Sequence, residues 1–246
     1  MRANNRRIAA AALALVLVVG GFAAWAWSGQ TSDKGRLALF TSLPIYWSES
    51  ASLDEMLDGP RERHWVRVTL EEGNDLVPLD TLDARSLAGI RKLIMAQPRP
   101  LAPTENVALD QWVRDGGQLL LFADPLLTEE SRFALGDKRR PQDVVLLSPI
   151  LRRWGLELTF DENQPAHERR IAYGSVAIPV HFAGSFTPAP AGTTDCTIAA
   201  DSVIARCSIG AGTVLVVADA ALLESGRDTG DGAPPLGRLL EAAFTD

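Results

Sequence analysis

WVRDGGQLLLFADP, residues 112–125, contains the end of a helix, a tight turn and a buried strand. The glycines at positions 116 and 117 can adopt the positive φ angles that end a helix. Residues 118–123 form an apolar run that is too short for a helix and is bounded by turn residues, so we expect a strand covered on both faces. Asp124 and Pro125 then end the strand. A helix that leads directly into such a strand predicts a parallel α/β sheet.

Similar apolar runs on both sides of this stretch extend the prediction to a mostly parallel sheet with helices between its strands. We expect strands at residues 36–41, 65–70, 92–97, 118–123, 156–160 and 213–218. We expect helices at residues 52–57, 103–115, 149–154, 220–226 and 234–244, with Ser148 as the N-cap of the third. Residues 76–82 should be irregular, because Pro78 cannot donate a ladder hydrogen bond.

The composition changes at about residues 169–209, where short runs of Val, Ile, Phe and Thr alternate with Gly and Pro. This pattern predicts an antiparallel β-hairpin insertion or an extension of the sheet edge. Within it, CTIAADSVIARC predicts two short strands around the turn at residues 200–202. Symmetric pairing about that turn places Cys196 opposite Cys207, close enough for a disulfide, and two unpaired buried thiols are the alternative.

The amino-terminal segment differs in composition from the rest of the chain. Residues 8–27 are uncharged and follow three arginines, and twenty such residues are about the length of a transmembrane helix. Because the arginines precede this run, the amino terminus should lie in the cytoplasm and the rest of the chain in the periplasm of a bacterial cell. A cleaved signal peptide with Ala24-Trp25-Ala26 as its cleavage site, or a buried soluble helix, are the alternatives.

We therefore expect a single-pass inner-membrane protein with a transmembrane anchor at residues 1–27, a linker at 28–35 and a periplasmic α/β domain at 36–246. Beyond residue 27 the chain has 21 lysines and arginines against 31 aspartates and glutamates, a net charge of −10. This acidic balance argues against nucleic acid as a partner. An oxidising compartment outside the cytoplasm would allow the predicted disulfide to form.

No motif for catalysis, metal binding or cofactor binding is present in the sequence. The chain has no phosphate-binding G-x-x-x-x-G-K-[ST] motif and no G-x-G-x-x-G motif, so it is not expected to be the ATPase of a transporter. Its three histidines match no metal spacing, and we expect neither a metal nor a cofactor. Ser42 could be paired with His64 or His181 as a nucleophile and base, but no G-x-S-x-G elbow supports this, and a capping or hydrogen-bonding serine is favoured.

Polar and aromatic residues follow the expected strands, at the edge where ligand sites of parallel sheets lie. The segments LLLFADPLL and VLVVADAALLE resemble each other and place their aspartates at equivalent strand ends. We expect seven side chains at this edge: Thr41, Ser42, Tyr46, Trp47, Arg99, Asp124 and Asp219. They would suit a polar ligand such as a sugar or peptide. The alternative is that the two aspartates cap the following helices and the aromatic residues cover the end of the sheet.

Residues 36–226 resemble the uncharacterised ABC-type transport-system family, whose members include gliding-motility-associated ABC accessory proteins. The resemblance is found in the segments AQPRPLAPTENVALDQWVRDGGQLLLFADP, LLSPILRRWGLEL and VLVVADAALLESG. It implies a flavodoxin-like sheet similar to that of class I glutamine amidotransferases, on an envelope protein that works beside the ATPase and permease of an ABC transporter. Family members often have several transmembrane helices, whereas this chain shows one.

The amidotransferase-like fold needs a cysteine on the turn after its third strand, and this chain has Ala96-Gln97-Pro98 there. We therefore expect a non-enzymatic, membrane-tethered periplasmic accessory or ligand-sensing subunit associated with an ABC-type transport or envelope system. An envelope hydrolase that uses the strand-end carboxylates and a purely structural partner-binding protein are the alternatives.

Overall fold

The computed structural model describes residues 34–49, 63–190, 195–227 and 229–245. The expected anchor, most of the linker and the expected helix at 52–57 lie outside these residues. Among the helices that the structure describes, none is long and apolar enough to cross a membrane.

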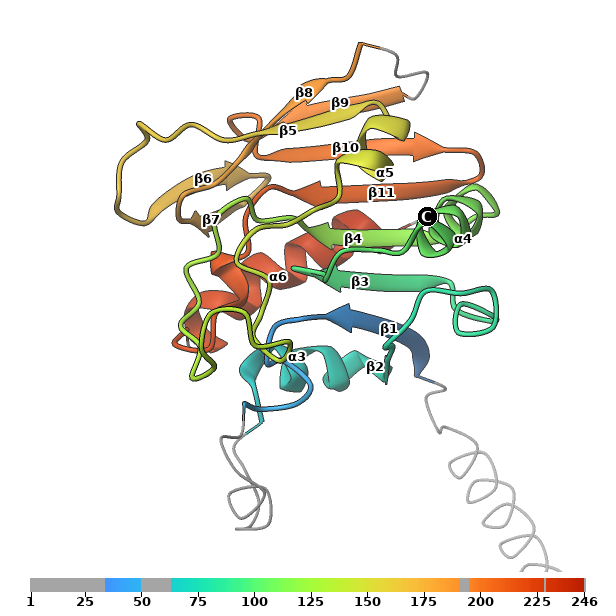
Figure 1. The fold of residues 1–246 in the computed structure, drawn as a ribbon, viewed down its shortest axis with the longest axis horizontal. Helices are drawn as coiled ribbons and strands as arrows, with labels where there is room; N and C mark the ends of the chain where they lie inside the picture. Colours follow the sequence, from blue (N-terminus) through green and yellow to red (C-terminus); the bar gives the residue numbers. More distant parts are fainter. Residues whose placement is uncertain (1–33, 50–62, 191–194, 228, 246) are drawn as a thin grey trace, which may run out of the picture. The chain divides into compact units, whose positions relative to one another are not determined.

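The described residues form a mixed α/β structure around a mostly parallel sheet, as predicted (Figure 1). The strand order is β2-β1-β3-β4-β11-β10-β9, in which the first five strands are parallel and β10 runs antiparallel to both of its neighbours. The parallel strands are β2 (Asn74–Pro78), β1 (Gly35–Thr41), β3 (Lys92–Ala96), β4 (Gln118–Phe122) and β11 (Gly212–Val217). The antiparallel edge consists of β10 (Ile204–Ile209) and β9 (Asp195–Ala199).

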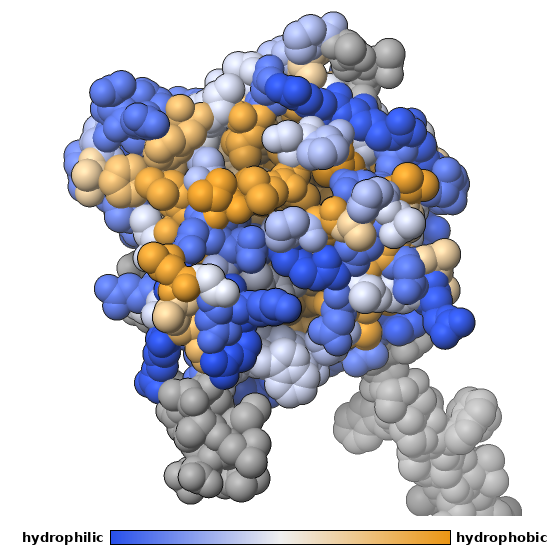
Figure 2. All heavy atoms as spheres, in the orientation of Figure 1, coloured by the Kyte–Doolittle hydropathy of each residue, from blue (hydrophilic) through white to orange (hydrophobic). Residues whose placement is uncertain are grey.

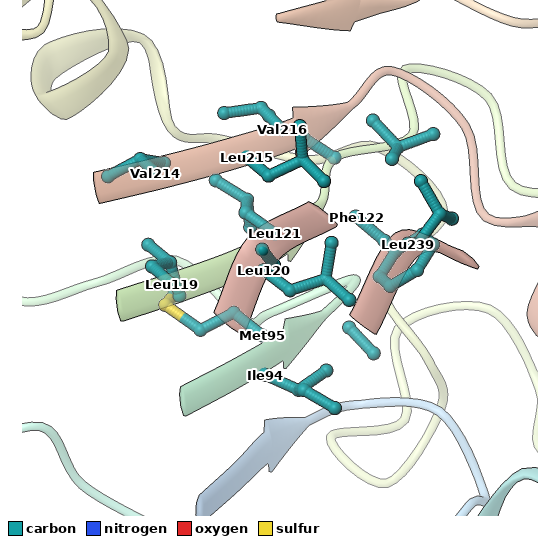
Figure 3. Packing of buried hydrophobic residues seen from close by; sticks show 14 of the residues in the cluster. Ile94, Met95, Leu119, Leu120, Leu121, Phe122, Val214, Leu215, Val216 and Leu239 are labelled. Atoms are coloured by element: carbon teal, nitrogen blue, oxygen red, sulfur yellow. The ribbon is translucent and has the colours of Figure 1, made fainter. Parts of the chain in front are cut away.

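Strand β4 and the helix before it confirm the prediction from residues 112–125. Helix α4 (Pro103–Arg114) ends before Gly116, whose φ of +104° favours glycine. The following Gly117 lies against the indole of Trp112, where a Cβ atom would come within 2.5 Å of the ring. Leu119 and the next three residues are 0 % exposed, and because alternate side chains point to opposite faces, both faces of β4 are covered (Figure 3).

The helices that cover the sheet are joined in two pairs. Helix α3 (Trp65–Gly73) packs against α6 (Thr229–Phe244), which runs beside β4 and β11. Leu239 of α6 lies among the core side chains of the sheet (Figure 3). Helix α4 packs against α5 (Ser148–Arg153), and the indole nitrogen of Trp154 donates to a carboxylate oxygen of Asp110 at 3.0 Å.

The strand predicted at residues 65–70 is wrong, because this segment is the first part of helix α3. The side chain of His64 accepts a hydrogen bond from the Val66 amide at 3.2 Å and so caps the helix. Arg67 and Glu71 form an ion pair one helical turn apart, at 2.7 Å. The alternation of apolar and polar residues in WVRVTL therefore fits one buried helix face as well as it fits a strand.

The irregular segment predicted at residues 76–82 is also wrong in its first part, which belongs to strand β2. This strand pairs only with β1, in parallel register, with Pro78 opposite Leu39. The missing amide of Pro78 is tolerated because β2 is the edge strand of the sheet and ends at this residue. The next amide, that of Leu79, donates to the Leu39 carbonyl at 2.8 Å.

Two helices begin at other residues than predicted, and a third predicted helix is shorter. Ser148 is the first residue of α5, and Leu147 takes the N-cap position. The helix expected at 220–226 is a single 3-10 turn, η1 (Ala221–Leu223). Helix α6 begins at Thr229, before its two prolines, and not at Pro234.

The segment from 169 to 209 forms both an insertion and an edge extension. Strands β6 (Arg169–Tyr173) and β7 (Val176–Val180) make a separate antiparallel pair, and β8 (Ser185–Pro188) pairs with β5 (Leu156–Thr159). Strands β9 and β10 continue the main sheet with Cys196 directly opposite Cys207, and the two are joined by the predicted disulfide. The turn between them has φ angles of +50° to +67° at Ala200, Asp201 and Ser202.

Candidate functional site

A pocket of about 700 Å³ opens at the carboxyl ends of β2, β1 and β3. The chain passes from β1 to β2 on one side and then returns to β3 on the other, so β1 and β3 flank the point where the strand order reverses. Ligand sites of open α/β sheets lie outside the strands at this point. The pocket is lined by residues 40–44, 46–49, Leu79, Asp80, Arg99, Phe133, residues 138–140 and Gln142.

Aromatic side chains form much of the pocket surface. The ring of Tyr46 is held by Arg67, whose guanidinium lies 4.1 Å from the ring centre and donates to the Tyr46 carbonyl at 2.9 Å. Trp47 meets Tyr46 edge to face, with 4.9 Å between ring centres, and is 72 % exposed. A large exposed indole on a fixed neighbour offers an apolar surface to a ligand at the pocket mouth.

The hydroxyl groups of Thr41 and Ser42 connect loops at the pocket wall. The Thr41 hydroxyl donates to the Ala96 carbonyl at 2.8 Å. The Ser42 hydroxyl donates to the Gln97 carbonyl at 2.5 Å and accepts from the Gln142 amide at 3.0 Å. Because the hydrogen of Ser42 points to a carbonyl oxygen and not to a histidine, the geometry favours the structural role of this serine.

Arg99 is fixed in the pocket wall by a two-pronged ion pair. Its terminal nitrogens donate to the two carboxylate oxygens of Glu105 at 2.8 and 2.9 Å, and its guanidinium lies 5.0 Å from the ring centre of Phe40. The hydrogen bonds from Arg99 lower the pKa of Glu105 to about 2. Arg99 therefore lines the pocket as a rigid, charge-paired group.

Asp124 and Asp219 follow β4 and β11 as the sequence indicated, but they do not line the pocket. They are 0 % and 1 % exposed, and we call them the buried aspartate pair. Asp124 accepts from the amides of Leu126 and Ala220 at 2.8 and 3.0 Å. Asp219 accepts from the amides of Ala221 and His181 at 2.7 and 2.8 Å. All four carboxylate oxygens are thus used to fix the backbone after the strands.

Burial raises the pKa of both members of this pair. The pKa of Asp124 rises to about 7, chiefly because the charged carboxylate is removed from water. The pKa of Asp219 is raised well above its ordinary value by burial and by the neighbouring charge of Asp124. These shifts make the pair sensitive to pH, while the hydrogen bonds show that both side chains fix loop backbone and that neither provides the N-cap of a helix.

The loop after β4 supplies pocket residues that the sequence did not indicate as site residues. The sequence shows Lys138, Arg139 and Arg140 as a basic cluster, yet nothing in their spacing indicates that they lie beside the β1 loop. Phe133 and Gln142 reach the pocket from the same loop. One contact that holds the loop there is the Gln142–Ser42 hydrogen bond, between residues that are 100 positions apart.

Gln97 follows β3, and its side chain connects the end of β4 with the loop that contains Gln142. It is 0 % exposed and has a φ of +43°, in the left-handed region that non-glycine residues seldom adopt. Its side-chain oxygen accepts from the Asp124 amide at 2.9 Å, and its side-chain nitrogen donates to the carbonyls of Asp124 and Gln142 at 3.0 and 2.7 Å. Gln97 therefore holds in place the end of β4 and the loop at residues 137–143, which we call the basic loop.

The described part of the pocket wall contains no histidine. His64 caps α3, and burial lowers its pKa to about 4, so its ring is neutral at pH 7. Glu49 accepts from the Ser131 hydroxyl and the Arg132 amide, each at 2.7 Å. Among the described residues no three His, Cys, Asp or Glu side chains are grouped as metal ligands.

No protein-family model matches the sequence, and no curated protein matches it either. Solved structures with a similar fold include the N-terminal domain of mmIFT52, at a TM-score of 0.52 and 13 % identity, covering 85 % of this chain and 98 % of that domain. The similarity to this domain is one of fold alone.

Two further structures fit less well. An exo-β-1,4-mannosidase from an Opitutaceae bacterium has a TM-score of 0.46 at 15 % identity, over 84 % of this chain and 34 % of the mannosidase, so this chain spans about a third of that enzyme. A ThuA-like protein from Bacteroides uniformis has a TM-score of 0.46 at 10 % identity, over 87 % of this chain and 91 % of that protein.

Proposed function

We propose that this chain is a non-catalytic ligand-sensing subunit, tethered to the inner membrane, that acts beside the ATPase and permease of an ABC-type transport or envelope system. The observation behind the sensing role is the pocket of about 700 Å³ at the reversal point of the strand order. Its volume is in the range of small-molecule sites. Five of the seven residues that the sequence indicated line it: Thr41, Ser42, Tyr46, Trp47 and Arg99.

The topology supports a flavodoxin-like arrangement similar to that of class I glutamine amidotransferases. The five parallel strands have the order 2-1-3-4-5 along the chain, which is the flavodoxin-like order. Gln97 occupies the turn after the third strand, where the nucleophilic cysteine of an amidotransferase would be, and its amide is engaged in three hydrogen bonds. This supports a binding role in which the strained turn fixes loops and does not present a nucleophile.

The proposed location rests on the uncharged segment at residues 8–27 and on the disulfide, which fits an oxidising compartment. The described domain begins at the amino end of β1, and the pocket lies at the carboxyl ends of the parallel strands. The pocket is therefore at the edge of the sheet opposite to the point where the chain enters the domain.

The hydrolase alternative is less well supported by the geometry. An enzyme that uses the strand-end carboxylates needs them in contact with a substrate. The buried aspartate pair is at most 1 % exposed, and its oxygens accept hydrogen bonds from loop amides. The partner-binding alternative has one observation in its favour. Large hydrophobic side chains are exposed at Trp47, Val107, Leu126, Leu135, Val144 and Leu146. Figure 2 also shows a band of hydrophobic residues across one face of the domain.

The test is affinity purification of the full-length protein from intact membranes, followed by mass spectrometry of what is retained. We expect an ABC-type ATPase and permease to be recovered with the wild-type protein. A matched control is the same chain with residues 8–27 replaced by an unrelated transmembrane helix, which shows whether partners are held by the domain or by the anchor. Recovery of neither subunit, from membranes that contain the protein at normal level, would contradict the proposed association.

A further inference from the structure

We infer that the ligand of this pocket is an acidic sugar, whose carboxylate is bound by the basic loop at residues 137–143 in exchange for the loop's own aspartates. This inference rests on the proposed ligand-binding function. It adds the chemical class of the ligand and the residues that select it.

The basic loop brings cations to one side of the pocket. Lys138, Arg139 and Arg140 line it in succession, and the guanidinium of Arg139 lies 4.2 Å from the ring centre of Phe133. Lys138 is exposed and makes no salt bridge with any residue that the structure describes. Its ammonium group can therefore meet a ligand without losing a partner within the described chain.

The arginines of the loop are paired, but with carboxylates that a ligand can replace. Nε and one terminal nitrogen of Arg139 donate to the two carboxylate oxygens of Asp137, at 3.1 and 2.7 Å. A carboxylate of a ligand could accept the same two parallel hydrogen bonds. The two side chains are 60 % and 28 % exposed, so water screens their attraction. Arg140 donates from Nε and a terminal nitrogen to one carboxylate oxygen of Asp143, at 3.1 and 2.9 Å. Arg139 and Arg140 line the pocket and the two aspartates do not, so a ligand carboxylate would take over the donor groups that Asp137 and Asp143 now use.

The aromatic part of the pocket wall suits the ring of a sugar. Trp47 is exposed at the mouth and Tyr46 is fixed beneath it by Arg67. A flat indole with nearby backbone and side-chain polar groups can contact the C–H face of a sugar while its hydroxyls are hydrogen-bonded. Aromatic rings and exchangeable arginine–carboxylate pairs in one pocket fit a ring that carries a carboxylate.

Binding of an acidic ligand must depend on the basic loop and not on the overall charge of the domain. Beyond residue 27 the chain has a net charge of −10, so its general field repels an anion. Attraction of an acidic sugar must then come from the basic loop, and it should be lost when the loop is changed. General charge effects can be measured separately with a distant pair of the same kind.

The experiment measures binding of paired acidic and neutral oligosaccharides, glucuronate-containing and glucose-containing chains of equal length, to the full-length protein in detergent. Asp137→Asn removes the internal competitor and should tighten binding of the acidic member by about threefold, while Lys138→Gln should weaken it by a similar factor. The matched control is Glu157→Gln, which frees Arg152 of an equally exposed pair outside the pocket (64 % and 34 %) and makes the same change in net charge.

The outcomes separate the inference from the function on which it rests. Binding of the acidic chain that tightens in the Asp137 variant and not in the Glu157 variant supports the inference. Equal binding of the neutral and acidic chains, or equal effects of the two variants, overturns the acidic class and leaves the binding function in place. No binding of either chain overturns the inference, whereas the proposed sensing function is tested separately by the recovery of transporter subunits.

Discussion

Replacing Gln97 with leucine should destabilise the protein by about 3–5 kcal/mol, although the two side chains are similar in size. The amide of Gln97 makes three hydrogen bonds, one to the Asp124 amide, one to the Asp124 carbonyl and one to the Gln142 carbonyl. Leucine keeps the volume and removes all three. The change therefore tests the polar link between the end of β4 and the basic loop, and leaves the packing nearly constant.

The expected loss of stability depends on which hydrogen bonds each partner of Gln97 keeps in the variant. The Asp124 amide is in a fully buried residue and loses its acceptor, which costs about 1–3 kcal/mol. The Asp124 carbonyl still accepts from the Val145 amide at 3.0 Å, and the Gln142 carbonyl is near the surface. Each of these two lost bonds should cost about 1 kcal/mol. The strained φ of Gln97 is unchanged, because leucine is no better suited to it than glutamine.

Urea denaturation followed by circular dichroism at pH 7 gives the two unfolding free energies. The matched control is Gln111→Leu, because the Gln111 side chain is exposed on α4 and makes one hydrogen bond, to Asp115 at 2.9 Å. That control should change the unfolding free energy by at most about 0.5 kcal/mol. If the Gln97 variant loses no more stability than the control, the amide does not hold the two loops and the account of the pocket wall fails.

Three further perturbations test the fold around the site. Replacing both Cys196 and Cys207 with alanine removes a disulfide with a sequence separation of 11 and should lower the unfolding free energy by about 3 kcal/mol. Urea titration without a reducing agent measures this, and an unchanged midpoint would show that the bond contributes nothing. Because burial raises the pKa of the buried aspartate pair, the folded state binds more protons than the unfolded state between about pH 4 and pH 7, so the stability due to the pair should fall as pH rises through this range. The unfolding free energy of the wild type minus that of Asp124→Asn, measured from pH 4 to pH 8, should decrease with pH, and a flat difference refutes the assignment. Gly212→Ala places a Cβ 2.0 Å from a backbone carbonyl of α4 and should prevent or strongly impair folding, whereas Gly35→Ala meets nothing within 4 Å and should fold normally, as circular dichroism will show.

The centre of the sheet could be predicted from the sequence because its signals are local. The buried strands β3, β4 and β11 are short, continuous apolar runs bounded by turn residues. The disulfide was predictable for a similar reason, since the turn at residues 200–202 fixes which cysteine faces which. Helix α3 was not, because WVRVTL has a pattern that both a strand and a helix can satisfy, and the cap that decides between them is a side-chain hydrogen bond of His64.

The pocket could be predicted only in part. The β1 loop and Arg99 follow strands directly, so their place at the carboxyl edge follows from the topology. The basic loop reaches the pocket through hydrogen bonds of Gln142 to Gln97 and Ser42, which no local pattern reveals. For the buried aspartate pair, the sequence indicated correctly that both residues follow buried strands. It did not indicate their burial, which depends on how the neighbouring backbone amides are arranged.

Isothermal titration calorimetry of the full-length protein with the acidic oligosaccharide, for the wild type and for Trp47→Ala, tests directly whether the pocket binds the ligand. The control is Val107→Ala, because Val107 is 70 % exposed and Trp47 72 %, and Val107 does not line the pocket. We expect saturable binding that weakens by about tenfold in the Trp47 variant and is unchanged in the control. Binding that is equally strong in all three proteins would contradict the assignment of the pocket as the ligand site.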